Sequence, residues 1–130
     1  DPFFSVLGGE GSPVGNVLAV HVRHPDYAIV GIDPFTGREL WRKRTGGLLQ
    51  YFSFSNDGRY LAILSRTGQL SVLKAETGAP AFETCCVGES AKSMLFSEKG
   101  DRLFVYFTGH GFIGDDYQNG FCGFCGRNTL

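Results

Sequence analysis

The sequence lacks any apolar run long enough to cross a membrane as a helix. No stretch approaches the roughly 20 consecutive apolar residues that such a helix needs. The four Cys residues are too few for a disulfide scaffold and do not indicate an oxidising compartment. Glycine and other turn-forming residues recur too often for any helix of about 10 residues. We therefore expect a chain without helices or a membrane partner, located in the cytoplasm.

The sequence also lacks an excess of positive charge. It has 12 Lys and Arg residues against 13 Asp and Glu residues, a net charge of −1. A nucleic-acid-binding domain of this size is usually clearly basic, so nucleic acid is not an expected partner outside a ribosomal complex. A small basic cluster (Arg38, Arg42, Lys43 and Arg44) surrounds the single Trp41. Such a cluster can bind an acidic partner or RNA phosphate, but on an outer strand it also discourages edge pairing, and we favour that interpretation.

What the sequence has in abundance is glycine and aromatic residues. There are 19 Gly, 12 Phe and 5 Tyr in 130 residues. Aromatic residues favour strands, and frequent glycines favour the tight turns that join short strands. Gly8-Gly9-Glu10-Gly11 lacks the Lys-Ser/Thr of a phosphate-binding loop, and we expect it to be a flexible connection. The composition therefore predicts an all-β protein.

A turn motif recurs three times along the chain. Segments 12–20, 55–63 and 97–105 all read Ser-x-x-Gly-x-x-Leu followed by two apolar residues. Their turn glycines, Gly15, Gly58 and Gly100, lie 43 and 42 residues apart. Each motif stands between two apolar runs, which is typical of a hairpin turn.

A second motif recurs with nearly the same period. Its glycines, Gly37, Gly78 and Gly120, lie 41 and 42 residues apart, and an aromatic residue follows each of them by four positions. The positions involved are Thr36, Gly37 and Trp41 in the first copy, Thr77, Gly78 and Phe82 in the second, and Gly120 and Phe124 in the third. Two motifs with one period indicate a true structural repeat.

Each repeat accommodates four short antiparallel strands in about 42 residues, which is typical of a β-propeller blade. We predict three consecutive four-stranded blades at about 3–47, 48–88 and 89–130. Propellers have four or more blades. We therefore expect the chain, which starts at Asp1 rather than at Met, to be a fragment of a larger propeller, or to complete a ring by self-association.

The repeats resemble known propeller families. The segment 54–62, Phe-Ser-Asn-Asp-Gly-Arg-Tyr-Leu-Ala, resembles WD-type repeats, although no copy has their Trp-Asp dipeptide. The segment 31–41, followed by Gly47, is similar to the quinoprotein repeat Ala-x-Asp-x-x-Thr-Gly-x-x-x-Trp, with Gly31 in place of Ala. That resemblance implies that Trp41 is a packing peg between blades. The second copy departs from the pattern, with Lys74 at the Asp position and Phe82 at the Trp position.

A further resemblance concerns the third repeat. Leu95-Phe96-Ser97-Glu98-Lys99-Gly100, together with the Gly-rich polar stretch after Tyr106, resembles the early blades of the eukaryotic translation initiation factor two-A family. This resemblance implies binding to the ribosome or the initiation machinery.

Few residues are candidates for chemistry. Cys122 and Cys125 form half of a zinc-ribbon pattern, but a second such pair is absent, so we expect no metal there. Cys85-Cys86 matches the vicinal pair of some quinoprotein dehydrogenases, yet we expect small buried side chains instead. His21, His24 and His110 are expected to be hydrogen-bonded at strand ends or in loops. We predict no catalytic residues and no cofactor.

The sequence thus predicts a non-catalytic, WD-repeat-like scaffold that binds protein partners or further blades. A translation initiation factor propeller and a quinoprotein-type oxidoreductase fragment are the alternatives. The fold analogy carries this expectation, because propeller sheets hold loops in fixed positions.

Overall fold

The structure is a computed structural model of the whole chain, and it describes residues 6–66, 68–84, 91–100, 102–107 and 111–115. All regular elements in these ranges are strands, and the described residues contain no helix that could cross a membrane. The strands are β1 (Val6–Gly11), β2 (Leu18–Val22), β3 (Ala28–Ile32), β4 (Glu39–Arg44), β5 (Leu49–Phe54), β6 (Tyr60–Ser65), β7 (Leu70–Lys74), β8 (Pro80–Thr84), β9 (Ala91–Phe96), β10 (Leu103–Phe107) and β11 (Gly111–Asp115).

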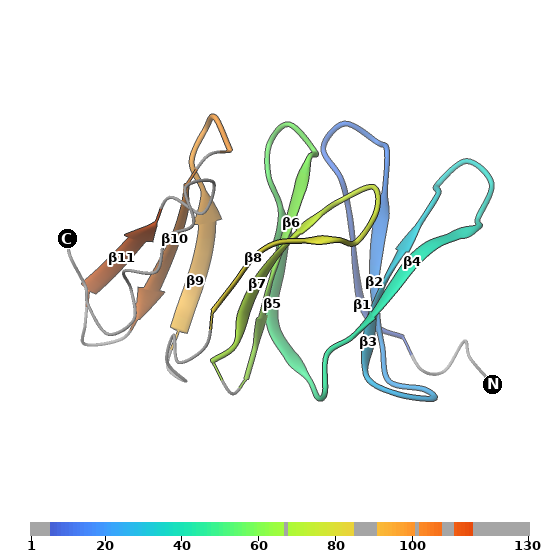
Figure 1. Cartoon of the computed structure of the whole chain (residues 1–130), viewed down its shortest axis with the longest axis horizontal. Coiled ribbons are helices and arrows are strands. Elements are labelled where there is room, and N and C mark those ends of the chain that lie inside the picture. The colour runs from blue at the N-terminus through green and yellow to red at the C-terminus, as the bar shows by residue number, and fades with distance from the viewer. Residues whose placement is uncertain (1–5, 67, 85–90, 101, 108–110, 116–130) are drawn as a thin grey trace.

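The strands form three antiparallel sheets that stand side by side in chain order (Figure 1). The first sheet is β1 to β4 and the second is β5 to β8, each with its strands paired in sequence order. The third sheet has β10 between β9 and β11, and the predicted fourth strand around Phe124 lies outside the described residues. Strand β5 contacts both β1 and β9, so the first strand of each sheet faces its counterpart in the next. This confirms the all-β prediction of consecutive antiparallel propeller blades.

One local expectation was wrong. The stretch Gly8–Gly11, predicted to be a flexible connection, belongs to strand β1 and pairs with β2 through partners such as Gly9↔Val20 and Glu10↔Ala19. Backbone hydrogen bonds form a ladder whatever the side chain is, so low strand propensity did not prevent pairing. A Cβ at Gly8 would lie 3.7 Å from the Phe52 ring of β5, which is an ordinary van der Waals distance, so packing does not require glycine there.

The core consists of two apolar clusters, one on each side of the second sheet. Leu61 and Ile63 of β6 join the first-sheet residues, whereas Ala62 and Leu64 pack with Phe96 and Leu103 of the third sheet. Successive side chains of a strand point to opposite faces, so a strand between two sheets buries every residue. This explains the unbroken apolar run of β6, of which Leu61, Ala62 and Leu64 have no exposed surface.

Candidate interaction surface

Five turns lie at one end of the three sheets, which we call the turn end (Figure 1). Three of them are the Ser-x-x-Gly turns. In each, the glycine amide donates to the serine carbonyl, at 2.9, 3.0 and 2.9 Å for Gly15, Gly58 and Gly100. These glycines have φ between 74° and 76°, a left-handed conformation that favours glycine. The three copies of the first motif thus form the same turn.

The two Thr-Gly turns are also alike. Gly37 donates to the Asp33 carbonyl at 2.8 Å, and Gly78 donates to the Lys74 carbonyl at the same distance. Thr36 and Thr77 hold the turns through their hydroxyls, which accept the amides of Arg38 and Ala79, each at 3.2 Å. The Lys74 substitution leaves this geometry intact because the turn uses its backbone.

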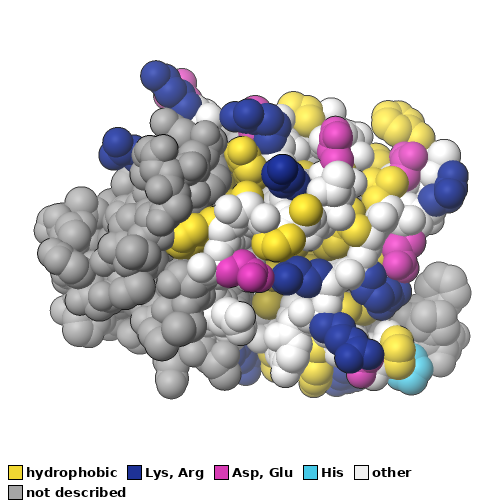
Figure 2. Space-filling view, in the orientation of Figure 1, with side chains coloured by type: hydrophobic (Ala, Val, Ile, Leu, Met, Phe, Trp, Pro, Cys, Tyr) yellow, Lys and Arg dark blue, Asp and Glu magenta, His cyan; other side chains and the backbone are white. Residues whose placement is uncertain are grey.

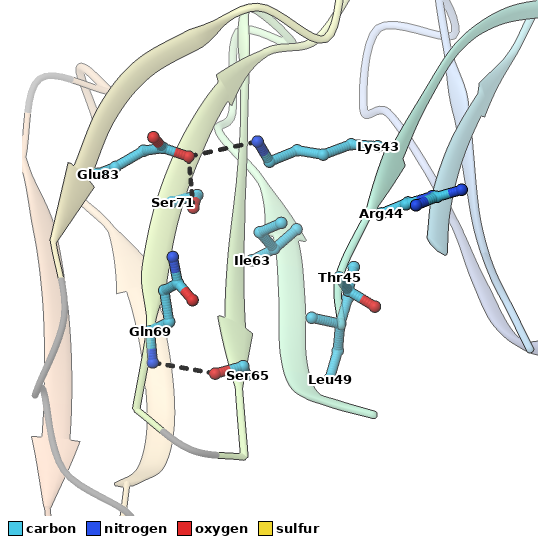
Figure 3. A pocket seen from close by; sticks show the side chains of 9 residues that line it. All are labelled: Lys43, Arg44, Thr45, Leu49, Ile63, Ser65, Gln69, Ser71 and Glu83. Carbon is cyan, nitrogen blue, oxygen red and sulfur yellow. Dashed lines mark hydrogen bonds and ion pairs between the residues drawn. The ribbon is translucent and has the colours of Figure 1, made fainter. Parts of the chain in front are cut away.

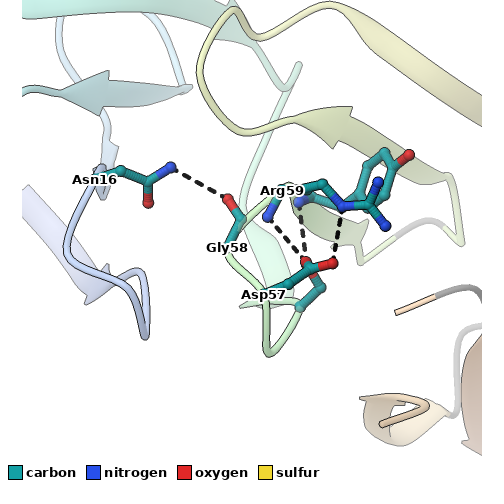
Figure 4. A network of polar contacts seen from close by, with 6 residues as sticks. Asn16, Asp57, Gly58 and Arg59 are labelled. Carbon is teal, nitrogen blue, oxygen red and sulfur yellow. Dashed lines mark hydrogen bonds and ion pairs between the residues drawn. The ribbon is translucent and has the colours of Figure 1, made fainter. Parts of the chain in front are cut away.

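A polar network links the first two Ser-x-x-Gly turns (Figure 4). The Asn16 side-chain amide donates to the Gly58 carbonyl at 3.4 Å and to Glu76 at 3.3 Å. Asp57 accepts the Ser55 hydroxyl at 2.8 Å and the Arg59 guanidinium at 2.8 Å. Slight burial works to raise the pKa of Asp57, but hydrogen bonds from the Arg59 backbone, Ser55 and the Arg59 side chain lower it overall. The network fixes neighbouring turns relative to one another.

Two apolar side chains project from this end. Phe35 is 87% exposed in the turn between β3 and β4, and Val14 is 57% exposed in the turn between β1 and β2. Hydrophobic side chains are visible on the upper edge of Figure 2, where these turns lie. Exposed apolar side chains on rigid, hydrogen-bonded turns are suited to protein contacts.

Trp41 packs between the first two sheets. Its Nε1 donates to the Ala75 carbonyl of the second sheet at 2.7 Å, and its side chain is 8% exposed. The ring lies against two glycines. A Cβ at Gly78 would come within 2.7 Å of the ring, and one at Gly31, its cross-strand partner, would also collide with it. The peg role implied by the quinoprotein resemblance agrees with this packing.

The second sheet has a different cross-strand pair at the same repeat position. Val72 pairs with Phe82 there, where Gly31 pairs with Trp41 in the first sheet. Phe82, whose ring is smaller than that of Trp41, thus faces Val72, which is larger than Gly31. Phe82 is half-buried and packs on the cluster between the second and third sheets.

Three of the four residues of the basic cluster pair with acidic neighbours. Arg42 pairs with Glu39 at 3.0 Å, Lys43 with Glu83 at 3.3 Å and Arg44 with Asp26 at 3.2 Å. Lys43 and Glu83 belong to adjacent sheets and line an open cavity of about 100 Å³, whose wall includes Ser71 (Figure 3). In Figure 2, basic and acidic side chains are interleaved over this region. A single positive patch for phosphate is therefore absent from these described residues.

The remaining candidates divide into two groups. Those outside the described residues are Cys85, Cys86, His110, Gly120, Cys122, Phe124 and Cys125. Among the residues that the structure does describe, no three His, Cys, Asp or Glu side chains lie together as a metal site would require. His24 is exposed, whereas His21 is buried beside the last residue of β2, near the strand end that the sequence predicts.

His21 is a buried titratable group, and its burial is what sequence reasoning missed. It is 3% exposed, its ring meets Phe52 edge-on at 6.1 Å, and its Nε2 has no hydrogen-bond partner. Burial lowers its pKa, although a hydrogen bond with the Gly47 backbone opposes this. The burial comes from a neighbouring sheet about 30 residues away, which local sequence does not reveal.

This burial predicts acid sensitivity. A His side chain in an unfolded chain has a pKa of about 6.5, and the pKa of His21 in the folded chain is lower. Below about pH 6.5 the unfolded chain therefore binds a proton more readily at His21 than the folded chain does. Stability should be constant above about pH 6.5 and fall as the pH drops below it. We expect a lower urea midpoint at pH 5.5 than at pH 7.5, and a smaller difference in His21→Gln. The exposed His24→Gln variant is the control, and an unchanged pH effect in His21→Gln would contradict the prediction.

Comparisons with known proteins agree with this architecture. Residues 25–120 match the PQQ_2 family, described as outer membrane protein assembly factor BamB. No curated protein sequence matches the chain significantly.

Three examples represent the solved structures to which the chain is similar. The WD40 repeats of RRP9 give a TM-score of 0.71 at 14% identity, with 86% of this chain and 35% of that chain covered. BamB from Moraxella catarrhalis gives 0.68 at 20% identity, with 84% and 31% covered. Kuenenia stuttgartiensis hydrazine synthase gives 0.66 at 17% identity, with 83% and 31% covered.

These likenesses show the fold, and the chain spans about a third of the length of each of these structures. The family match shows membership of a family and not the fold alone, because it extends over most of the 130 residues. The chain therefore belongs to the PQQ_2 family of repeat proteins, whose description is outer membrane protein assembly factor BamB.

Proposed function

We propose that the chain is a non-catalytic propeller scaffold that binds a protein partner through its turn end. The observation that carries this proposal is the exposure of Phe35 and Val14 on turns that hydrogen bonds hold in place. Exposed aromatic side chains on a rigid frame lose little conformational freedom on binding, so they make effective anchors.

The surroundings of these anchors indicate the chemistry of the partner. The Arg59 guanidinium is bound to Asp57, and Glu76 receives the Asn16 amide, so this region carries both signs of charge. A partner of mixed charge with an apolar pocket for Phe35 fits such a surface better than a polyanion does.

The family supports a binding role. It is described as an assembly factor, and protein-binding scaffolds commonly take part in assembling other proteins. The WD40 propellers among the similar structures also have a fold that is suited to a protein-interaction scaffold. A role in translation initiation rests on sequence resemblance alone and stays a prediction, as does the cytoplasmic location.

Site-specific photocrosslinking tests the turn end. A photoreactive residue at position 35 is expected to form adducts with a defined partner. One at position 66, exposed in the β6–β7 turn at the opposite end, is the matched control and should form none with it. Phe35→Ser should then weaken binding of the identified partner about tenfold or more, as loss of a hot-spot aromatic does. Equal adducts at both positions, or unchanged affinity in Phe35→Ser, would contradict the proposal.

An oxidoreductase is the second candidate, favoured by the quinoprotein-type repeat and the likeness to hydrazine synthase. Such quinoproteins need a calcium site built from carboxylate and amide groups. Among the described residues no three His, Cys, Asp or Glu side chains gather, so they offer no carboxylate cluster for such an ion. Quinone-dependent dye reduction by the purified chain would favour this candidate over the scaffold.

A further inference from the structure

A second cavity lies at the end of the sheets opposite the turn end. It has a volume of about 320 Å³, and its wall comes from the β2–β3 turn and from the end of β4 with the loop that follows. The residues in the wall are Arg23, Pro25, Asp26, Tyr27, Arg44 and Gly46. Small-molecule sites in proteins have volumes of about 300–1,000 Å³, so this cavity has room for one small organic ligand.

Hydrogen bonds hold the two wall segments together. The Thr45 amide donates to the Tyr27 carbonyl at 2.9 Å, next to the ladder pair Ala28↔Arg44. The Thr45 hydroxyl donates to the Gly47 carbonyl at 2.7 Å, which fixes the loop after β4. The wall is therefore preformed, and binding does not have to spend free energy on ordering it.

The charges in the wall leave one positive group without a partner. Arg44 pairs with Asp26 at 3.2 Å, so these two groups neutralise each other. Arg23 is exposed and has no acidic partner among the described residues. Two guanidinium groups and one carboxylate give the cavity a single net positive charge. A ligand with one negative charge complements it, whereas Asp26 would repel a phosphate dianion.

The rest of the wall is suited to an apolar group. Pro25 and the half-buried Tyr27 add apolar surface beside the guanidinium groups. Basic, acidic and apolar side chains lie close together at the lower right of Figure 2, where Figure 1 places the β2–β3 turn. A planar guanidinium binds a carboxylate through two parallel hydrogen bonds, and the apolar wall favours a hydrocarbon group on the same ligand.

We propose that this cavity binds an organic monocarboxylate, whose carboxylate pairs with Arg23 and whose apolar group packs against Pro25 and Tyr27. A free carboxylic acid and the C-terminal residue of a peptide share this chemistry. The proposal goes beyond the partner bound at the turn end, because the cavity lies at the other end of the sheets and does not depend on that partner.

An NMR titration of the full chain tests the proposal. The probes are 4-methylpentanoate and the peptide acetyl-Gly-Gly-Leu, which present the same branched apolar group beside a carboxylate. Each should shift the backbone signals of residues 23–27 and 44–46, with a dissociation constant in the millimolar range expected of so small a contact. The corresponding carboxamides lack the negative charge and should bind about tenfold more weakly. Equal binding of acid and carboxamide, or no shift in these two ranges, would overturn the proposal.

A pair of arginine variants shows whether Arg23 itself is responsible. Arg23→Gln should weaken binding about tenfold, because it removes the guanidinium that pairs with the carboxylate. Arg38→Gln is the matched control, since Arg38 is also exposed and has no described acidic partner, but lies in the β3–β4 turn at the turn end. An equal loss in the two variants would overturn the proposal. The carboxamide comparison uses the unmodified chain, so it stays decisive if a variant fails to fold.

Asp26→Asn should change the affinity in the opposite direction. It removes the negative charge from the wall and frees Arg44, so both probes should bind several-fold more tightly. Unchanged or weaker binding would overturn the charge argument on which the proposal rests.

Competition identifies the kind of anion and its source. Inorganic phosphate should not displace 4-methylpentanoate at equal concentration, and displacement would overturn the proposal. Tighter binding of the peptide than of 4-methylpentanoate would support the proposal and assign the cavity to a peptide C-terminus. Tighter binding of 4-methylpentanoate would support it equally and assign the cavity to a free carboxylic acid.

Discussion

Trp41→Ala is expected to lower the free energy of unfolding by about 3–5 kcal/mol, the usual cost of truncating a buried large aromatic side chain. The substitution removes an indole that is 8% exposed and leaves the Ala75 carbonyl without its donor. Both effects act at the interface between the first two sheets, because Trp41 packs with Leu61, Ile63 and Leu73 of the second sheet. Equilibrium urea denaturation measures the loss.

Two variants separate the causes of this effect. Trp41→Phe retains most of the apolar ring but cannot donate to Ala75, so it should cost less, about 1–3 kcal/mol for the unpaired carbonyl. Phe35→Ala removes an aromatic ring that is 87% exposed and should change stability by less than about 0.5 kcal/mol. A loss in Trp41→Ala no larger than that in Phe35→Ala would show that the indole does not join the sheets.

Gly78→Ala should destabilise the chain by about 2–5 kcal/mol, from two separate causes. At φ 75° an L-residue costs about 1–2 kcal/mol. The new methyl group would also lie 2.7 Å from the Trp41 ring, and forcing extra atoms into a packed contact costs about 1–3 kcal/mol. The same urea experiment gives the total.

The repeat supplies the control for this second substitution. Gly37 has φ 77° with nothing within 4 Å of a Cβ, so Gly37→Ala should show the backbone cost alone. In a Trp41→Ala background, the cost of Gly78→Ala should fall to that of Gly37→Ala, because the ring is gone. Equal costs for the two glycines in the wild-type background would refute the steric part.

The turns could be predicted from the sequence because their determinants are local. A Ser and a Gly three positions later specify a turn that needs no other part of the chain, and the three copies at Gly15, Gly58 and Gly100 share hydrogen bonds and backbone conformation. The strand order could be predicted from these turns, because consecutive strands joined by a short turn pair as antiparallel neighbours.

Contacts between residues distant in sequence could not be predicted in the same way. In the sequence, Gly31 is only a departure from the Ala of the quinoprotein pattern. In the structure, the ring of Trp41, its partner on the neighbouring strand, fills the space beside it. The acidic neighbours of the basic cluster gave no local signal, because Asp26 and Glu83, which pair with Arg44 and Lys43, are distant in sequence. Ala75, whose carbonyl accepts the Trp41 N–H, gave no signal, since its side chain takes no part in this hydrogen bond.

The cross-strand pairs Gly31–Trp41 and Val72–Phe82 also constrain how this protein can change over generations. A larger residue at position 31 has no room beside the indole, and a smaller ring at position 41 leaves a gap beside glycine. Neither member can vary alone without loss, whereas in a joint exchange to the other combination the smaller ring offsets part of the volume that the aliphatic residue adds. Positions 31 and 41 should therefore covary in an alignment of relatives, with a small residue, Gly or Ala, accompanying Trp and a larger aliphatic residue such as Val accompanying Phe.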